Sequence, residues 1–159
     1  MNTRHLATFC AASLLSCAAA LPTAARADTD ACTLLTPAQV GAAAGVPVSA
    51  GKHVTPTFVK TCTWSASGSS DVRFVTLYLQ TAAAYDGGKQ MASQMATGGA
   101  SVAPATVGDD GYYFIAGSQV GLLVKKGDVS FKVTVYATLP VARKEAMELA
   151  LAQEALAKL

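Results

Sequence analysis

The chain contains few of the residues that enzymes and metal sites use. Histidine occurs twice in 159 residues, and charged residues make up only 14% of the chain. Only His53 lies beyond the N-terminal leader described below, so a zinc site built from two or three imidazoles is excluded. No serine lies in a Gly-x-Ser-x-Gly motif, and no glycine-rich phosphate loop is present. We therefore expect no catalytic residue, no metal and no cofactor.

The first 27 residues have the pattern of a secretory signal peptide. A basic start, MNTRH, precedes an apolar run from Leu6 to Leu21, and a proline and small residues then lead to a cleavage site after Ala27. The run is shorter than the roughly 20 residues that a membrane-spanning helix needs. A weaker lipoprotein signal, LLSC, would instead leave a lipid anchor on Cys17. We favour cleavage after Ala27 and a periplasmic or secreted product; a membrane-anchored lipoprotein is the alternative.

The exported segment has no excess charge of either sign. Cleavage removes Arg4 and Arg26 and leaves ten basic against ten acidic residues over residues 28–159. Without a basic surface there is nothing to contact phosphates, so we expect no nucleic-acid partner. Residues 28–159 are enough for one domain and too few for two.

Two cysteines remain after the leader is removed. Cys10 and Cys17 leave with it, and Cys32 and Cys62 stay in a chain sent to an oxidising compartment. They are not arranged as a Cys-x-x-Cys redox pair, so we expect a structural disulfide. Closing the intervening loop stabilises a fold by roughly 3–4 kcal/mol.

Capping signals predict a short helix after Cys32, with the sequence PAQVGAAA. Thr36 and Gln39 form the Thr-x-x-Gln capping box, Pro37 suits the first helical position, and Gly45 suits a left-handed end. A second helix is predicted for AAAYDGGKQMASQMA in spite of its two glycines, and a third, opened by Pro140, for the C-terminal segment. The apolar face of the third is predicted to comprise Ala142, Ala146, Leu149, Leu156 and Leu159.

Alternating and β-branched residues predict five strands. They are KTCTWSA, VRFVTLYLQT, YYFIA, QVGLLVKK and VSFKVTVYA, the second being central and the last two joined by a tight turn at Gly127 and Asp128. The last strand is predicted to have one buried and one more polar face. Residues 97–111 show no periodicity and are predicted to form a long loop. The pattern indicates an α+β fold, an antiparallel sheet of about five strands covered on one side by two or three helices.

The candidate binding residues lie at the end of the predicted loop. Asp109 and Asp110 suit a bend whose carboxylates accept backbone N–H groups. If Phe114 points inward, one of Tyr112 and Tyr113 must face solvent, where it would form a contact surface. We therefore predict a ligand or partner site at Asp109, Asp110, Tyr112 and Tyr113. By contrast, Trp64 beside the cystine is predicted to be core, and His53 an exposed loop residue without a catalytic partner.

Three segments together resemble a known class of proteins. ACTLLTPAQVGAAAG, CTW and VGDDGYYF are similar to the Cys-x-Leu-Leu-Thr class of small exported bacterial proteins and lipoproteins. The resemblance extends from Cys32 to Tyr136. It implies that the two cysteines pair and that the fold is an α+β sandwich similar to PsbP-like domains. The class has no agreed activity, so no catalytic residue is transferred from it.

These observations leave three hypotheses for function. The favoured one is a non-catalytic envelope module that binds a protein or a small apolar ligand. The second is an accessory or structural subunit that docks on another envelope protein, and the third is an enzyme of an unfamiliar type that uses Asp109, Asp110 or His53. An apolar surface near Tyr112 would favour binding, whereas a deep polar cleft with His53 and an aspartate would favour the enzyme.

Overall fold

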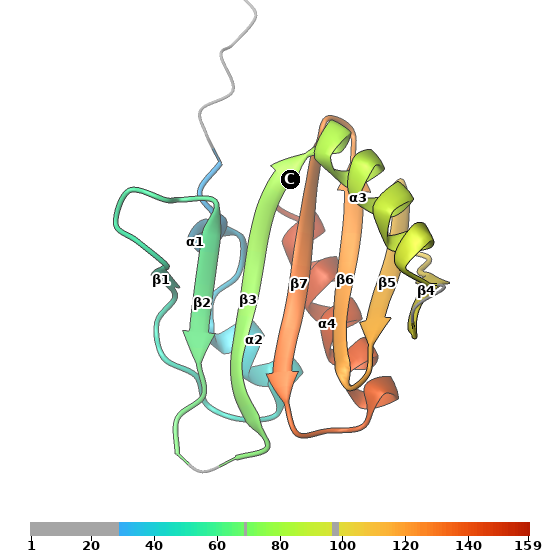
Figure 1. The fold of residues 1–159 in the computed structure, drawn as a ribbon. Coiled ribbons are helices and arrows are strands. Elements are labelled where there is room, and N and C mark those ends of the chain that lie inside the picture. Colours follow the sequence, from blue (N-terminus) through green and yellow to red (C-terminus); the bar gives the residue numbers. More distant parts are fainter. Residues whose placement is uncertain (1–28, 69, 97–98) are drawn as a thin grey trace, which may run out of the picture.

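The computed structural model describes residues 29–68, 70–96 and 99–159. Within them a single antiparallel sheet of seven strands runs in the order β1-β2-β3-β7-β6-β5-β4 (Figure 1). The strands are β1 Lys52–His53, β2 Thr61–Ser65, β3 Val72–Thr81, β4 Ala100–Pro104, β5 Asp110–Ala116, β6 Gln119–Lys126 and β7 Val129–Ala137. The helices are α1 Ala31–Leu34, α2 Pro37–Ala44, α3 Ala82–Met95 and α4 Val141–Leu156. The predicted α+β class with an antiparallel sheet is confirmed, and the predicted number of strands was too low.

The middle of the sheet is the pair formed by β3 and β7. The two strands are in register from Val72 opposite Ala137 to Thr81 opposite Val129, with one irregularity after Val72. From β3 the chain passes through α3 to the far edge at β4 and then returns strand by strand to β7. The central position predicted for β3 is therefore confirmed. The tight turn between β6 and β7 is confirmed as well, with Gly127 at a φ of 56°.

Helices cover both faces of the sheet, so the prediction of one covered side was wrong. Figure 1 shows α1, α2 and α4 behind the sheet and α3 in front of it. The main core lies behind the sheet, and a smaller cluster of Tyr85, Ala92 and Tyr112 lies under α3. On β7, Ser130 and Thr134 of the predicted polar face are buried. The alternation of β7 marked its two faces correctly but could not show that α3 would cover the second one.

The start of α2 follows its sequence signals. The Gln39 N–H donates to Thr36 Oγ1 at 3.2 Å, and the Thr36 N–H donates to Gln39 Oε1 at 2.9 Å. Pro37 occupies the first turn, and Gly45 ends the helix at a φ of 71°. The predicted capping box and left-handed end are both confirmed, because each depends on a few adjacent residues only.

The prediction of an irregular segment over residues 97–111 was wrong for Ala100–Pro104, whereas residues 105–109 are irregular as predicted. Thr97 and Gly98 lie outside the described residues, but Ala100–Pro104 forms β4 and pairs with β5, for example Val102 with Phe114. A strand at the sheet edge can form through backbone hydrogen bonds to one neighbour, even when its side chains are small and show no alternation. This brings the segment before Asp110 against the sheet.

The predicted apolar face of the C-terminal helix was right in part, because Leu149, Leu156 and Leu159 are half-buried against the main core. Ala142 and Ala146 are exposed, and the buried residues of α4 are Lys144, Met147, Glu148, Leu151, Ala152 and Ala155. The apolar residues on the outer surface are mostly alanines, which tolerate solvent well. Two charged residues on the buried side, Lys144 and Glu148, obscured the true pattern.

A search for membrane-spanning helices applies to the described residues only. No helix there combines the length and the apolar character needed to cross a bilayer. The predicted signal peptide over residues 1–27, and with it Cys17, lies outside the described residues.

Candidate functional site

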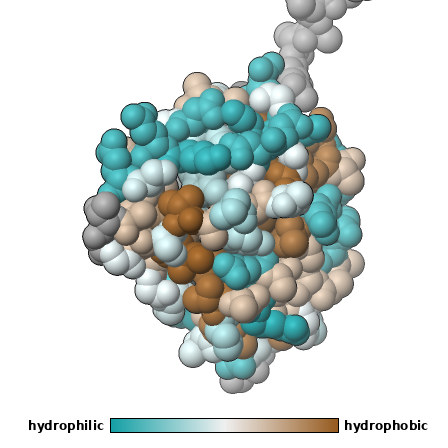
Figure 2. All heavy atoms as spheres, turned by 90° about the vertical axis from the view of Figure 1, so that its right-hand side faces the viewer, coloured by the Kyte–Doolittle hydropathy of each residue, from teal (hydrophilic) through white to brown (hydrophobic). Residues whose placement is uncertain are grey.

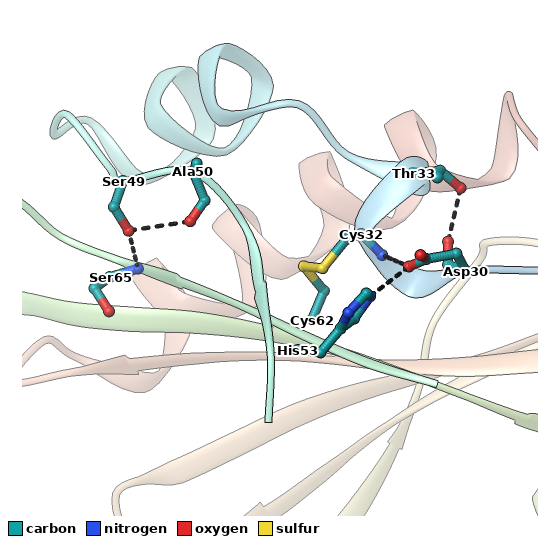
Figure 3. Close-up of a disulfide and its surroundings, with 8 residues drawn as sticks. All are labelled: Asp30, Cys32, Thr33, Ser49, Ala50, His53, Cys62 and Ser65. Atoms are coloured by element: carbon teal, nitrogen blue, oxygen red, sulfur yellow. Dashed lines mark hydrogen bonds and ion pairs between the residues drawn. A yellow bond between two sulfur atoms is a disulfide. The ribbon is translucent and has the colours of Figure 1, made fainter. Parts of the chain in front are cut away.

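Cys32 of α1 and Cys62 of β2 form a disulfide, as predicted, with their Cα atoms 4.9 Å apart (Figure 3). Trp64, two residues further along β2, is fully buried beside it, which confirms its core role. Gly51 passes so close that a Cβ there would lie 2.6 Å from Cys62 Sγ and 2.8 Å from Trp64 Nε1. The backbone at Gly51 therefore packs closely against both the disulfide and Trp64.

His53 pairs with Asp30 near the disulfide, so the prediction of an exposed, partnerless histidine was wrong. His53 Nε2 lies 2.8 Å from Asp30 Oδ1, which also accepts the Cys32 N–H at 2.7 Å (Figure 3). The hydrogen bond to His53 is the main cause that lowers the pKa of Asp30. Side-chain atoms of Asp30, Cys32 and His53 lie within 4.8 Å of one another. Because the Cys32 sulfur is bonded to Cys62, it supplies neither a thiolate ligand nor a nucleophile.

Asp109 and Asp110 are adjacent in the chain but have separate partners. Asp109 accepts hydrogen bonds from the Lys126 ammonium and from the Gly127 N–H, both at 2.8 Å. These bonds connect the start of β5 to the β6–β7 turn. Asp110 accepts the ammonium of Lys89 on α3 at 2.6 Å. These bonds, first of all those from the two lysines, lower the pKa of both carboxyl groups. The predicted carboxylate that accepts a backbone N–H is therefore present at Asp109. Asp110 instead attaches α3 to the sheet through Lys89.

Tyr112 and Tyr113 point to opposite faces of β5, and neither is exposed. Tyr112 is 2% exposed and packs edge-on against Tyr85 under α3, with ring centroids 5.3 Å apart. Tyr113 is 9% exposed, and its hydroxyl donates to the Glu145 carbonyl of α4 at 3.1 Å. The prediction that one of them faces solvent was wrong, because it assumed an uncovered face. Their role in binding stays a prediction.

The first half of α3 is fixed to the sheet by charges. Lys125 of β6 binds Asp86 at 2.7 Å, and Lys89 binds Asp110. Both ammonium groups also lie over the Tyr85 ring, 5.4 and 5.9 Å from its centre. Figure 2 shows a hydrophilic band at this upper end of the molecule and hydrophobic side chains gathered below it.

The second half of α3 leaves an apolar hollow against the sheet, which we call the α3 groove. Its volume is about 160 Å³. The residues lining it are Gly88, Met91, Ala92, Met95, Tyr112, Phe114, Leu123 and Lys132. Met91 and Met95 are 62% and 52% exposed, so flexible apolar side chains flank the groove. Of the predicted site residues, only Tyr112 contributes to it.

Lys132 is the one charged residue in the lining. Its side chain lies flat across Gly121 of β6, where a Cβ would come within 2.5 Å of Lys132 Cε and 3.3 Å of its Nζ. A glycine at position 121 is therefore what admits this side chain to the sheet surface. Among the described residues, the Lys132 ammonium makes no hydrogen bond and no ion pair.

A buried carboxylate lies where β6 and β7 separate. The two strands pair only from Leu122 opposite Val133 onward, and beyond this point their backbones diverge. Glu148 of α4, 0% exposed, fills the fork, and its Oε1 accepts the Val135 N–H at 2.9 Å. Burial raises the pKa of Glu148 to about 7. The N–H groups of Val135 and Leu122 and the charges of Lys132 and Lys144 act in the opposite direction.

Lys144 is the second buried charged residue of α4, and it lies at the same end of the sheet as Glu148. It is 1% exposed, and its ammonium donates to the carbonyl oxygen of Ser118, in the turn between β5 and β6. A cleft of about 440 Å³ lies at this end, lined by Arg73, the stacked rings of Phe74 and Tyr136, and Ser118 among others. Neither Lys144 nor Glu148 lines that cleft, so both charges act within the fold.

The sequence analysis missed the α3 groove, Lys132 and Glu148. A helix-to-sheet groove depends on which strands the helix crosses, and the sequence does not give that. The sequence did contain one signal for Glu148. Lys144 and Glu148 are four residues apart, and they lie on the side of α4 that also carries Leu151 and Ala155.

Comparison of the chain with protein-family models, with curated proteins and with solved structures found no match in any of the three.

Proposed function

We propose that the chain is a non-catalytic, exported binding module that holds one small apolar group in the α3 groove. The observation that carries the proposal is an apolar hollow of about 160 Å³ flanked by two exposed methionines. A dry cavity of about 150 Å³ is large enough for one benzene-sized molecule. The groove therefore suits one aromatic ring or a short alkyl chain, and it lies at Tyr112, where an apolar surface was expected to favour binding.

The surroundings of the acidic residues and of His53 support a non-catalytic role. Asp109 and Asp110 are each bound to a lysine, and His53 is bound to Asp30 beside a sulfur already in a disulfide. A general base needs a substrate proton within hydrogen-bond reach. None of these three side chains lines the α3 groove.

Two adjacent glycines of α3 provide a matched test. Gly88 lines the groove, and a Cβ there meets only the Tyr112 hydroxyl at 3.7 Å; Gly87 is exposed, and a Cβ there meets nothing within 4 Å. Leucine at either position should raise helix stability by about 1 kcal/mol, since glycine is a poor helix former. Gly88→Leu also fills the groove, whereas Gly87→Leu leaves it open.

The assay is ligand-observed NMR with neutral, ring-sized molecules such as indole and 4-phenylbutanol. We expect binding to the natural chain and to Gly87→Leu, and loss of binding in an equally stable Gly88→Leu. The proposal fails if none of these molecules binds the natural chain, or if Gly88→Leu binds them as well as Gly87→Leu does.

Export is part of the same proposal. We propose that the mature chain begins at Asp28 and is released into the periplasm or the medium, because the small-residue site before it is stronger than LLSC. The oxidised Cys32–Cys62 pair suits that compartment. Intact-mass measurement of the chain from the exporting cell decides the point, since a diacylated Cys17 would establish the lipoprotein alternative.

A further inference from the structure

The lining of the groove has one charged group, and it is a cation. All other side chains in the lining are apolar or aromatic, and the Lys132 ammonium lies among them with no hydrogen-bond or ion-pair partner in the described ranges. A lysine ammonium carries three donors, and partly covered donors are stabilised when an anion accepts from them. The groove therefore has an apolar wall and an unused cationic group, which together complement an amphiphilic anion.

Other charges near the groove do not neutralise Lys132 by direct contact. The Lys89 ammonium of α3 is bound to Asp110, and that of Lys125 is bound to Asp86. The charge of Lys132 acts to lower the pKa of Glu148. However, Glu148 Oε1 accepts a hydrogen bond from the Val135 N–H and not from the Lys132 ammonium. The donors of Lys132 thus stay available on the groove side.

We infer that the ligand of the α3 groove is a small carboxylate with one aromatic ring or short alkyl chain, its apolar part between α3 and the sheet and its carboxylate on Lys132. This inference rests on the proposed function, since it names the ligand class of the same groove. The occupant is a free small molecule, because the groove has room for one ring and a bridging chain only.

The position of the ammonium depends on Gly121. A Cβ at residue 121 would come within 2.5 Å of Lys132 Cε, so Gly121→Ala should displace the end of this flexible side chain while keeping its charge in the chain. Gly121 is thus a positioning residue for the carboxylate. In Gly121→Ala, the preference for a carboxylate ligand should therefore be closer to that of a chain without Lys132 than to that of the natural chain.

The test compares two probes with the same phenylpropyl group, 4-phenylbutyrate with a carboxylate end and 4-phenylbutanol with a neutral hydroxyl end, by calorimetric titration at low salt. We expect the carboxylate to bind about tenfold more tightly than the alcohol, the factor that one charged hydrogen bond typically contributes. Lys132→Gln should abolish this preference, measured as the ratio of the two affinities on the same variant. Lys132→Arg should restore it, and Gly121→Ala should reduce it.

The control is Lys52→Gln, because Lys52 is exposed on β1 and does not line the groove. Its preference for the carboxylate should equal that of the natural chain. If both probes bind equally, or if Lys132→Gln keeps the preference, the inference is overturned while the apolar groove stands. If neither probe binds the natural chain, the proposed function itself fails, and the inference fails with it.

Discussion

Glu148 of α4 accepts a hydrogen bond from the backbone N–H of Val135 at 2.9 Å, at a point where β7 has no partner strand on that side. In an unbroken sheet a carbonyl of β6 would accept this N–H. The two strands diverge, and the side chain of Glu148 supplies the missing acceptor from the helix behind. A buried carboxylate thus replaces one hydrogen bond of the sheet.

This arrangement predicts that stability falls as pH rises through neutrality. The folded-state pKa of Glu148 is raised from 4.5 to about 7, so between those values the folded chain holds a proton that the unfolded chain has lost. By linkage the free energy of unfolding decreases as pH rises from about 4.5 to 7, by about 3 kcal/mol in all. Above pH 7 both states have lost the proton, and this contribution stays constant.

Glu148→Gln should remove that dependence, because an amide keeps the acceptor for Val135 and carries no charge. Urea unfolding at pH 5, 6, 7 and 8 should show the variant gaining on the natural chain as pH rises. The control is Glu154→Gln, an exposed carboxyl of the same helix. Parallel stability profiles for the natural chain and Glu148→Gln would show that Glu148 is not the group responsible.

A second prediction concerns the disulfide. Cys62→Ser should lower the free energy of unfolding by about 2–5 kcal/mol, as is usual for small secreted domains that lose a native bridge. The double variant with Cys32→Ser should cost little more, because the bridge is already lost in the single one. Thiol labelling of the unreduced, unfolded natural chain should find neither Cys32 nor Cys62 free, and two labelled cysteines would contradict the bridge.

The third prediction uses the two adjacent tyrosines of β5. Both rings are buried, so Tyr112→Ala and Tyr113→Ala should each cost about 3 kcal/mol or more. The phenylalanine variants should differ. Tyr113→Phe loses the bond to the Glu145 carbonyl and should cost about 1 kcal/mol, whereas no such bond is recorded for Tyr112 among the described residues. Equal costs for the two phenylalanine variants, measured by urea unfolding, would contradict this assignment.

Local signals in the sequence predicted the elements that depend on few residues. The Thr36–Gln39 capping box, the left-handed Gly45 and the turn at Gly127 are each set by adjacent side chains or by glycine itself. The disulfide was predictable because only Cys32 and Cys62 remain beyond the predicted leader. The central strand β3 was predictable from its length and its apolar character.

What could not be predicted depends on contacts between distant segments. β4 has small residues and exists because β5 offers a backbone to pair with. The buried face of α4 includes Lys144 and Glu148, whose partners Ser118 and Val135 are distant in the chain, so a pattern of apolar residues identifies that face only in part. The predicted solvent exposure of one tyrosine was wrong for the same reason, since only the fold shows that α3 covers Tyr112.

The sheet divides the interior into two unequal parts, and this has a consequence for motion. On the α3 side, the small cluster under the helix contains Tyr85, Ala92 and Tyr112 as its buried members in the described chain, whereas the main core behind the sheet is far larger. Segments held by few buried contacts open at a lower free energy than the rest of a protein. Amide hydrogens of α3 should therefore exchange with solvent faster than those of α4, through an opening that leaves β3, β7 and the disulfide in place. Such an opening would give a ligand its way into the groove without unfolding the domain.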